Sequence, residues 1–307
     1  MKLKWKILVI ITLAVVAISG GIFMFLYREI DEDKHYSLEG IDEIQATVSS
    51  APVHIVRTEP GNEVRFHFYG KSLQEINLVS EIRNKTLIVE PRRKYFFFGT
   101  AEITHLDIYV PGEYGRKLFL KTTSGSVKLD SFSLMDFTLN TSSGDLETET
   151  IEVGKITVNT TSGRINLKKL GANELEIKGT SSLISVGECV VKEARIKTTS
   201  GKVTLENSIG NLNVQSTSGR ILVTCCEFQD RNIVFKTTSG SVTLGLPRIA
   251  EFSIEAKTAS GKFQSDFPIS LSQNVDERTI TGQIGMAKNK ISVQTTSGQV
   301  KVYKNNK

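Results

Sequence analysis

A Ser-Gly pair, preceded by Thr or Ser in all but one copy, recurs along most of the chain at a nearly constant interval. Gly163 and Gly201 are 38 residues apart, twice 19, so a further copy is predicted at Ser182. With that copy included, the repeat centres from Gly125 to Gly261 are spaced by 19, 19, 19, 19, 18, 21 and 21 residues. A fixed period of this length predicts stacked structural repeats. The predicted bend residues are Gly125, Gly144, Gly163, Ser182, Gly201, Gly219, Gly240, Gly261 and Gly298.

The residues on both sides of each bend alternate between apolar and polar. Ile156 and Val158 precede one bend, for example, and Ile165 and Leu167 follow it. This alternation predicts two half-buried strands joined by a tight bend, where glycine tolerates positive φ. The seventh position after the bend is also mostly apolar, so we expect a third inward-facing side. Inward Thr and Ser side chains are expected to stack as hydrogen-bonded ladders.

These patterns predict an all-β fold, a single-chain parallel β-solenoid (β-helix) with coils of about 19 residues, preceded by one transmembrane helix. A hairpin meander would also alternate, but identical register in every repeat favours stacked coils. The aromatic share of 7% fits coils filled by Ile, Val, Leu and Thr. We expect the solenoid over residues 40–307, less regular at 60–115. Residues 279–286 resemble a distorted coil, and residues 301–307 are expected to close the far end.

The N-terminus predicts a membrane anchor. Residues 7–26 form an uncharged, mainly apolar run, long enough to cross ~30 Å of hydrocarbon as a helix. Lysines precede this run and mostly acids follow it, which predicts a cytoplasmic N-terminus and an extracytoplasmic solenoid on the cell membrane. The expected parts are a short cytoplasmic tail (1–6), the anchor (7–27) and a linker (28–39).

A cleaved signal peptide is the competing interpretation, because Ala17-Ile18-Ser19 forms an acceptable cleavage pattern. The apolar run continues to residue 26, beyond what a signal peptide needs, so an uncleaved single-pass anchor is favoured.

No catalytic, metal or cofactor motif is present in the sequence. His35, His54, His67 and His105 lack partners at metal or catalytic spacing, and His54 and His67 are expected at exposed strand positions. We therefore expect no enzyme activity and no cofactor. A carbohydrate-active β-helix enzyme, the less favoured alternative, would need converging carboxylates. The acidic residues considered fall on different rows and coils: Asp145, Glu147, Glu176, Glu206 and Glu255.

The cysteines are expected to be small buried thiols. Cys189 and Cys226 both fall seven residues after a bend, two coils apart. Two strand spacings separate them by about 10 Å, beyond the ~7 Å Cα limit for a disulfide.

A basic and polar row lies four residues before each bend, and no acid occurs in it. The first position after the bend adds further cations. Stacked coil upon coil, these rows predict a stripe for an anionic wall polymer or lipid head groups. A merely solvated face that discourages aggregation is the alternative, and nucleic acid is disfavoured because the domain lies outside. The stripe residues are Lys121, Lys178, Lys197, Lys236, Lys257, Arg164, Lys202, Arg220 and Lys262.

A second candidate surface follows Pro91 and is expected to be a loop. Cations beside aromatic residues favour a membrane interface or a partner groove, and an aromatic plug over the open end of the solenoid is the alternative. The loop residues are Arg92, Arg93, Lys94, Tyr95, Phe96, Phe97 and Phe98.

The Thr-Ser-Gly-x-Val/Ile-x-Leu copies, such as residues 123–129 and 161–167, resemble those of a bacterial family of β-strand-repeat, adhesin-like proteins, a domain of unknown function. The chain is similar in particular to LiaG-type membrane-anchored members, from about residue 40 to the end. The resemblance implies a link to cell-envelope stress and supplies no catalytic residues. We expect a non-enzymatic binding or scaffolding module of the envelope. A regulatory accessory acting through a membrane protein partner is the alternative.

Overall fold

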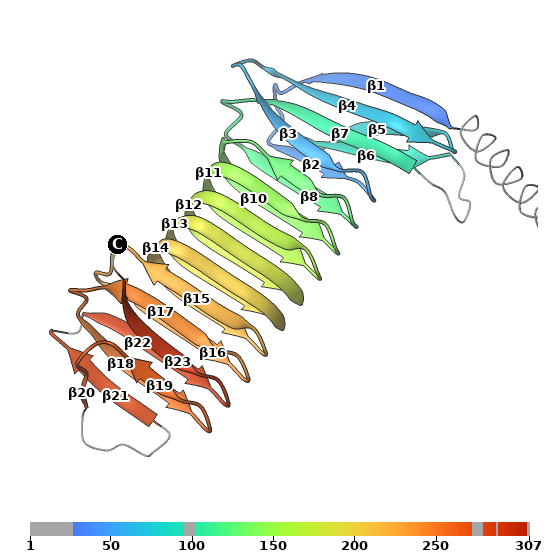
Figure 1. Ribbon diagram of the computed structural model, residues 1–307. Helices are drawn as coiled ribbons and strands as arrows, with labels where there is room; N and C mark the ends of the chain where they lie inside the picture. Colours follow the sequence, from blue (N-terminus) through green and yellow to red (C-terminus); the bar gives the residue numbers. More distant parts are fainter. Residues whose placement is uncertain (1–26, 95–101, 272–278, 287, 306–307) are drawn as a thin grey trace, which may run out of the picture.

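The computed structural model describes residues 27–94, 102–271, 279–286 and 288–305, and every regular element there is a β-strand. The strands stack into a rod of coils (Figure 1). They form one continuous, largely parallel sheet, so the predicted all-β solenoid is confirmed for the described residues. The central strands are β8 (Lys117–Thr122), β9 (Val127–Leu129), β10 (Phe132–Thr141), β11 (Leu146–Thr160), β12 (Arg164–Gly179), β13 (Ser181–Thr198) and β14 (Ser200–Ser216).

Neighbouring coils are in the predicted register. Ile151 lies opposite Leu170, and Leu170 lies opposite Cys189, in each case 19 residues further along the chain. Ser182 lies opposite Gly201, so the copy predicted at Ser182 is confirmed. Strand β11 pairs with β12 in three stretches broken at residues 149 and 154, which confirms the third side of the coil.

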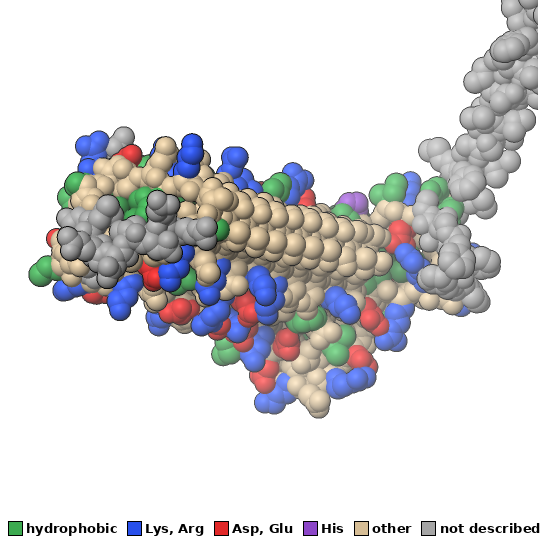
Figure 2. Space-filling model, turned by 90° about the horizontal axis from the view of Figure 1, so that it is seen from below, with side chains coloured by type: hydrophobic (Ala, Val, Ile, Leu, Met, Phe, Trp, Pro, Cys, Tyr) green, Lys and Arg blue, Asp and Glu red, His purple; other side chains and the backbone are tan. Residues whose placement is uncertain are grey.

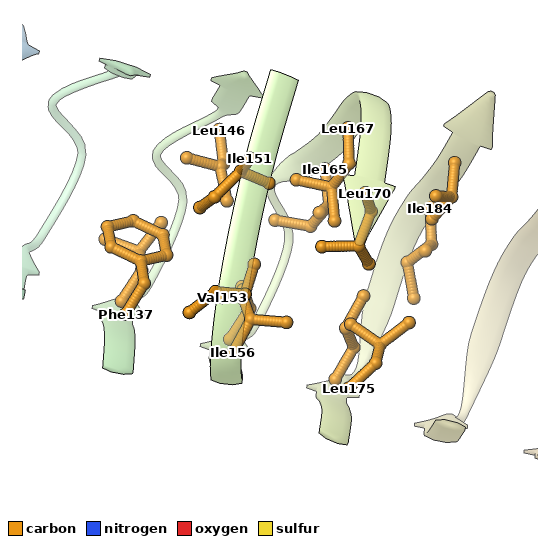
Figure 3. Close-up of a cluster of buried hydrophobic side chains, with 14 of the residues drawn as sticks. Phe137, Leu146, Ile151, Val153, Ile156, Ile165, Leu167, Leu170, Leu175 and Ile184 are labelled. Atoms are coloured by element: carbon orange, nitrogen blue, oxygen red, sulfur yellow. The ribbon is translucent and has the colours of Figure 1, made fainter. Parts of the chain in front are cut away.

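The core is a stack of apolar rows inside the coils. Ile156, Ile165 and Leu175 are fully or almost fully buried. Figure 3 shows such side chains from successive coils packed against one another. Each coil therefore buries its apolar side chains against its neighbours, which is why the repeat needs to stack.

The inward threonines stack from coil to coil as predicted, with Thr141 opposite Thr160. In the described residues their hydroxyls form no side-chain ladder with one another and bond to backbone groups: the Thr198 hydroxyl, for example, donates to the Thr180 carbonyl oxygen of the preceding coil at 3.3 Å. The hydroxyl of Thr141, three residues before the bend, accepts a hydrogen bond of 2.8 Å from the backbone N–H of Gly144 in its own bend. The same bond links Thr160 to Gly163 at 3.0 Å and Thr237 to Gly240 at 2.9 Å. The buried threonine thus closes its own bend, as Ser and Thr commonly do in turns.

Close packing, more than positive φ, requires the bend glycines. A Cβ on Gly144 would meet the backbone carbonyl oxygen of Gly125 in the preceding coil, well inside van der Waals contact. Gly163 and Gly240 meet the coil before them in the same way. Among the bend glycines only Gly201 has positive φ, at 143°. The prediction that glycine occupies the bends because it tolerates positive φ is therefore wrong for the other bend glycines.

The third-side row holds Cys225, and not Cys226 as predicted. A register shift after Leu205 places Ser208 opposite Cys225. Cys225 and Cys189 are buried, Cys226 is exposed, and all three are free thiols. The shift could not be read from a constant repeat length.

At the C-terminal end, the order of coils in space differs from their order in the chain. Strands β22 and β23 lie between two earlier coils: β22 pairs with β16 and β18, and β23 pairs with β17 and β19. Residues 301–305 are therefore inside the stack and do not close the far end. The strands here are β15 (Arg220–Cys225), β16 (Asn232–Thr237), β17 (Val242–Pro247), β18 (Phe252–Thr258), β19 (Phe263–Ser265), β22 (Asn289–Thr295) and β23 (Val300–Asn305).

Antiparallel strands cap this end. Strand β21 (Thr279–Ile284) pairs antiparallel with β18 and with β20 (Ser270–Leu271). The interpretation of residues 279–286 as a distorted coil is therefore wrong.

The N-terminal end is capped in a similar way. Strands β2 and β3 lie inside the stack, between β6 and β8 and between β7 and β9. Antiparallel β5 covers β6, and β4 and β1 cover β7. The expected linker is therefore largely strand β1. The strands are β1 (Arg28–Ser37), β2 (Glu43–Thr47), β3 (Val53–Thr58), β4 (Glu63–Ser72), β5 (Ile76–Arg83), β6 (Thr86–Arg93) and β7 (Glu102–Pro111).

The predicted membrane anchor at residues 7–27 lies almost wholly outside the described residues. Among those described, no helix is long and apolar enough to span a membrane.

Candidate functional site: two basic surfaces beside the bends

The row four residues before each bend is continuous in space. Lys121, Asn140, Asn159, Lys178 and Lys197 lie opposite one another in successive coils. The row continues through Gln215, Lys236, Gln294 and Lys257, and the inserted C-terminal coil supplies Gln294. Because that coil lies inside the stack, the row extends without a gap.

The lysines of this row differ in their partners. Lys178 pairs with Glu176 at 2.5 Å and Lys257 with Glu255 at 2.6 Å, so an adjacent carboxylate offsets each charge. Lys121, Lys197 and Lys236 form no ion pair with any described residue. Between the cations, the Asn159 side chain donates a 2.8 Å hydrogen bond to Asn140, an amide ladder from one coil to the next.

Two hollows lie between this row and the bends, and each runs along the row. One, of about 330 Å³, runs from Lys121 to Lys178, and the other, of about 320 Å³, runs from Lys197 to Gln294. Exposed hydroxyl side chains two residues before the bend, such as Thr161 and Thr238, form their second wall. We call the row and its two hollows the lysine groove. Figure 2 shows regular rows of uncharged atoms along the rod with Lys and Arg side chains beside them.

The exposed hydroxyls repeat because backbone hydrogen bonds fix every bend to the one before. The N–H groups of Ser142 and Ser143 both donate to the carbonyl oxygen of Thr123, at 3.2 and 2.8 Å. Thr238 and Ser239 donate to Thr217 in the same way, at 3.1 and 2.8 Å. With these backbone groups occupied, the side-chain hydroxyls are what the bend offers to a ligand.

The row directly after the bend is a separate surface, although we predicted one stripe. It lies on the next side of the coil, with the exposed bend residues in between. Arg164 is held by Asp145 at 2.8 Å and is not a free cation. Lys202 lies directly opposite Arg220.

The predicted loop after Pro91 is only partly described. Strand β6 continues to Arg93, so the loop begins later than expected. Arg92 pairs with Glu90, Arg93 with Glu102 at 2.7 Å, and Lys94 with Glu75 at 3.1 Å. Each cation thus has a carboxylate partner. Tyr95, Phe96, Phe97 and Phe98 lie outside the described residues.

The four histidines lie near the N-terminal end of the rod, on strands β1, β4 and β7 and, inside the stack, on β3. This grouping was not predicted from the sequence. The ring of His67 lies 2.8 Å from an Asp31 oxygen, and His54 lies 3.0 Å from Asp130. Burial raises the pKa of Asp130, but hydrogen bonds from His54 and the Arg57 backbone outweigh it, so the pKa is lowered overall. In the described part of the chain, no three His, Cys, Asp or Glu side chains are placed to hold a metal ion.

The carboxylates considered for catalysis are separated and mostly paired with cations. Asp145 pairs with Arg164 and Glu147 with Lys168 on the side after the bend, and Glu176 pairs with Lys178 on the side before it.

The fold and these surfaces define the class of protein: a capped β-solenoid with basic, hydroxyl-lined faces. The Toastrack DUF4097 family model matches residues 41–303, so the chain belongs to that family. This agrees with the resemblance to adhesin-like repeat proteins.

Solved structures of related fold come from Parabacteroides distasonis and Bacteroides fragilis. A "putative lipid binding protein" from Parabacteroides distasonis is 16% identical over 89% of this chain and 96% of its own, with a TM-score of 0.52. A "putative adhesin" from Bacteroides fragilis is 12% identical over 90% of this chain and 97% of its own, with a TM-score of 0.42. At these identities the likeness concerns the fold alone. No curated protein matches the chain.

Proposed function

We propose that this chain is a non-enzymatic, adhesin-like binding module of the bacterial envelope that holds an extended polyanion along the lysine groove. The observation that carries the proposal is the unbroken row from Lys121 to Lys257, which contains cations and amides but no acid. A linear anion lying parallel to the rod would meet one polar side chain at each ~4.8 Å step. The exposed hydroxyls of the bends supply hydrogen bonds along the same path.

The proposed setting is the outer face of the membrane. Residues 7–26 and the lysines before them support a single-pass anchor with the solenoid outside. An anionic wall polymer is the ligand class that suits an exposed groove in this location. The resemblance to LiaG-type members favours a role in the response to envelope stress.

The test is binding of the full-length protein, in neutral detergent, to purified anionic wall polymer over a range of salt concentrations. The triple variant K121Q/K197Q/K236Q removes the groove lysines that lack ion-pair partners. Three exposed charges contribute together about 1–2 kcal/mol near an anionic partner, so a roughly tenfold loss of affinity is expected. Binding should also weaken as salt rises, because exposed charges are screened.

The control K85Q/K169Q/K192Q removes the same charge from positions outside the groove and should bind as the wild type does. Equal binding by the groove variant and the wild type would contradict the proposal. Salt-independent binding would contradict it too.

A further inference from the structure

The surface after the bends carries a compact cluster of cations in the C-terminal half of the rod. Lys202 and Arg220 lie in the first position after their bends, and Lys301 and Lys262 lie two and three coils beyond Arg220. We call these four residues the cation cluster. All four side chains are exposed. The cluster lies on a different side of the coil from the lysine groove.

Two cations earlier on the same surface, Arg164 and Lys168, are matched by acids. Arg164 pairs with Asp145 at 2.8 Å, and Lys168 pairs with Glu149 at 2.5 Å in the neighbouring coil. In the described part of the chain, the four residues of the cation cluster have no ion pair or side-chain hydrogen bond. In the first and third positions after the bends, the two halves of this surface therefore differ in electrostatic character.

The cluster is unfavourable for the empty protein. Lys202 and Arg220 are directly opposite on adjacent strands, where like charges destabilise a sheet. No carboxylate occurs in the first or third positions after the bends from Lys202 to Lys262. A bound anion would remove this repulsion.

A hollow of about 300 Å³ lies between these cations. Lys202, Arg220 and Lys301 border it, and the polar side chains of Ser241, Thr243 and Gln299 line it. Thr243 lies directly opposite Lys301 on the adjacent strand, so a hydroxyl-bearing and an ammonium-bearing side chain both border the hollow. The next coil towards the N-terminus presents Leu183 and Ser185 at the corresponding positions, which ends the charged area.

We propose that this hollow is a discrete site for a phosphate group, separate from the lysine groove. A phosphate offers several acceptor oxygens and up to two charges, which suit three surrounding cations and two hydroxyls. The planar guanidinium of Arg220 can bind two phosphate oxygens at once, and the lysines act as point charges. The phosphate can belong to a lipid head group or to a phosphate-bearing wall polymer.

The first test is thermal unfolding of the full-length protein in neutral detergent at low salt, with and without inorganic pyrophosphate. Ligand that binds only the folded state raises Tm, and an excess of about 100 times Kd stabilises by about 2.7 kcal/mol. We expect a pyrophosphate-dependent rise in Tm that R220Q/K301Q abolishes. Each variant is compared with its own ligand-free Tm, so a general loss of stability does not affect the result.

Two controls make the test specific. R164Q lies in the same row, where its partner Asp145 already neutralises it, and should keep the full shift. The groove variant K121Q/K197Q/K236Q should also keep it, even if polymer binding is lost, so this proposal and the proposed function can fail separately. A shift that is absent in the wild type, or unchanged in R220Q/K301Q, would overturn the site.

The second test identifies the source of the phosphate. Wild type and R220Q/K301Q are compared for binding to phosphatidylcholine vesicles containing phosphatidic acid and to soluble poly(glycerol phosphate). Binding to one probe that depends on Arg220 and Lys301 supports the site and names the source. Equal binding of both proteins to both probes would count against it.

Discussion

Gly179 and Ser182 have exchanged the roles that a threonine and a glycine hold in most other coils. In those coils a threonine or serine three residues before the bend closes it by accepting a hydrogen bond from the glycine N–H, as Thr160 does for Gly163. Here the glycine occupies the earlier position, and a Cβ on it would collide with the Ser182 side chain. Ser182 is fully buried, and its hydroxyl has no hydrogen-bond partner. The serine thus fills the space that a threonine side chain occupies in other coils.

This exchange predicts strong coupling between the two positions. G179T alone should destabilise by about 1–3 kcal/mol, because the new side chain has no room beside Ser182. G179T/S182G should be at least as stable as the wild type, since it restores the bend hydrogen bond and removes a buried unpaired hydroxyl. Denaturant unfolding of the wild type, both single variants and the double variant measures the coupling. Additive effects would contradict this account.

The bend glycines should be intolerant of any side chain, including those that accept positive φ. G144A should destabilise by more than about 3 kcal/mol, because its Cβ would press on the Gly125 carbonyl oxygen of the coil before. G144N should be no better, although asparagine tolerates positive φ. The exposed neighbour gives the matched control S143A, which should cost little. Rescue by asparagine in chemical unfolding would show that conformation, and not close packing, selects glycine.

The buried thiols predict a loss of stability at alkaline pH. Burial raises the pKa of Cys189 and Cys225 to about 12 from an ordinary value of 9.0. Above pH 9 the unfolded chain releases these protons and the folded chain keeps them. Stability should therefore be full below pH 9 and fall towards pH 12, by on the order of 1 kcal/mol per pH unit for each thiol. Denaturant midpoints from pH 8 to 11 measure the slope.

The variant C189A/C225A is the control for this slope. It lacks both buried thiols, so its stability should depend less on pH over the same range, although cavities lower it throughout. If the slope is unchanged, groups other than the two buried thiols cause the loss of stability at alkaline pH. Cys226 is exposed and should be the one thiol that reacts readily with an alkylating reagent in the native protein.

The inserted C-terminal coil predicts an unusual response to truncation. Deleting residues 289–307 removes β22 and β23, which lie between β16/β17 and β18/β19. Amide protection should then be lost in β18 and β21 as well, since their link to the rest of the stack is gone. A solenoid with coils in chain order would lose only its last coil. Hydrogen exchange of the truncated and full chains distinguishes the two.

The interior of the rod could be predicted closely from the sequence, because each coil repeats the same environment. The alternation around Ile156 and Ile165 specified the buried rows, and the 38-residue gap located Ser182. The insertion of β22 and β23 could not be predicted, since every coil has the same edges and the motif does not encode their order. Cys225 was missed because a local register shift changes which residue faces inward.

The candidate site was predicted only in part. The residues predicted to share a row do lie opposite one another in successive coils, because this depends on strand alternation alone. Which cations are neutralised depends on acidic neighbours in adjacent coils, as with Asp145 beside Arg164. The prediction counted the cations in the rows and did not consider these neighbours. The separation of the two basic surfaces follows from the bend that lies between them.

The central claim, that a polyanion lies along the lysine groove, is tested most directly by lysine footprinting. Acetylation rates of individual lysines are measured by mass spectrometry in the full-length protein, with and without anionic wall polymer. The account predicts that polymer slows modification of Lys121, Lys197 and Lys236 several-fold, while Lys169 and Lys192 react at unchanged rates. Uniform slowing of all five lysines, or no slowing in the groove, would contradict it.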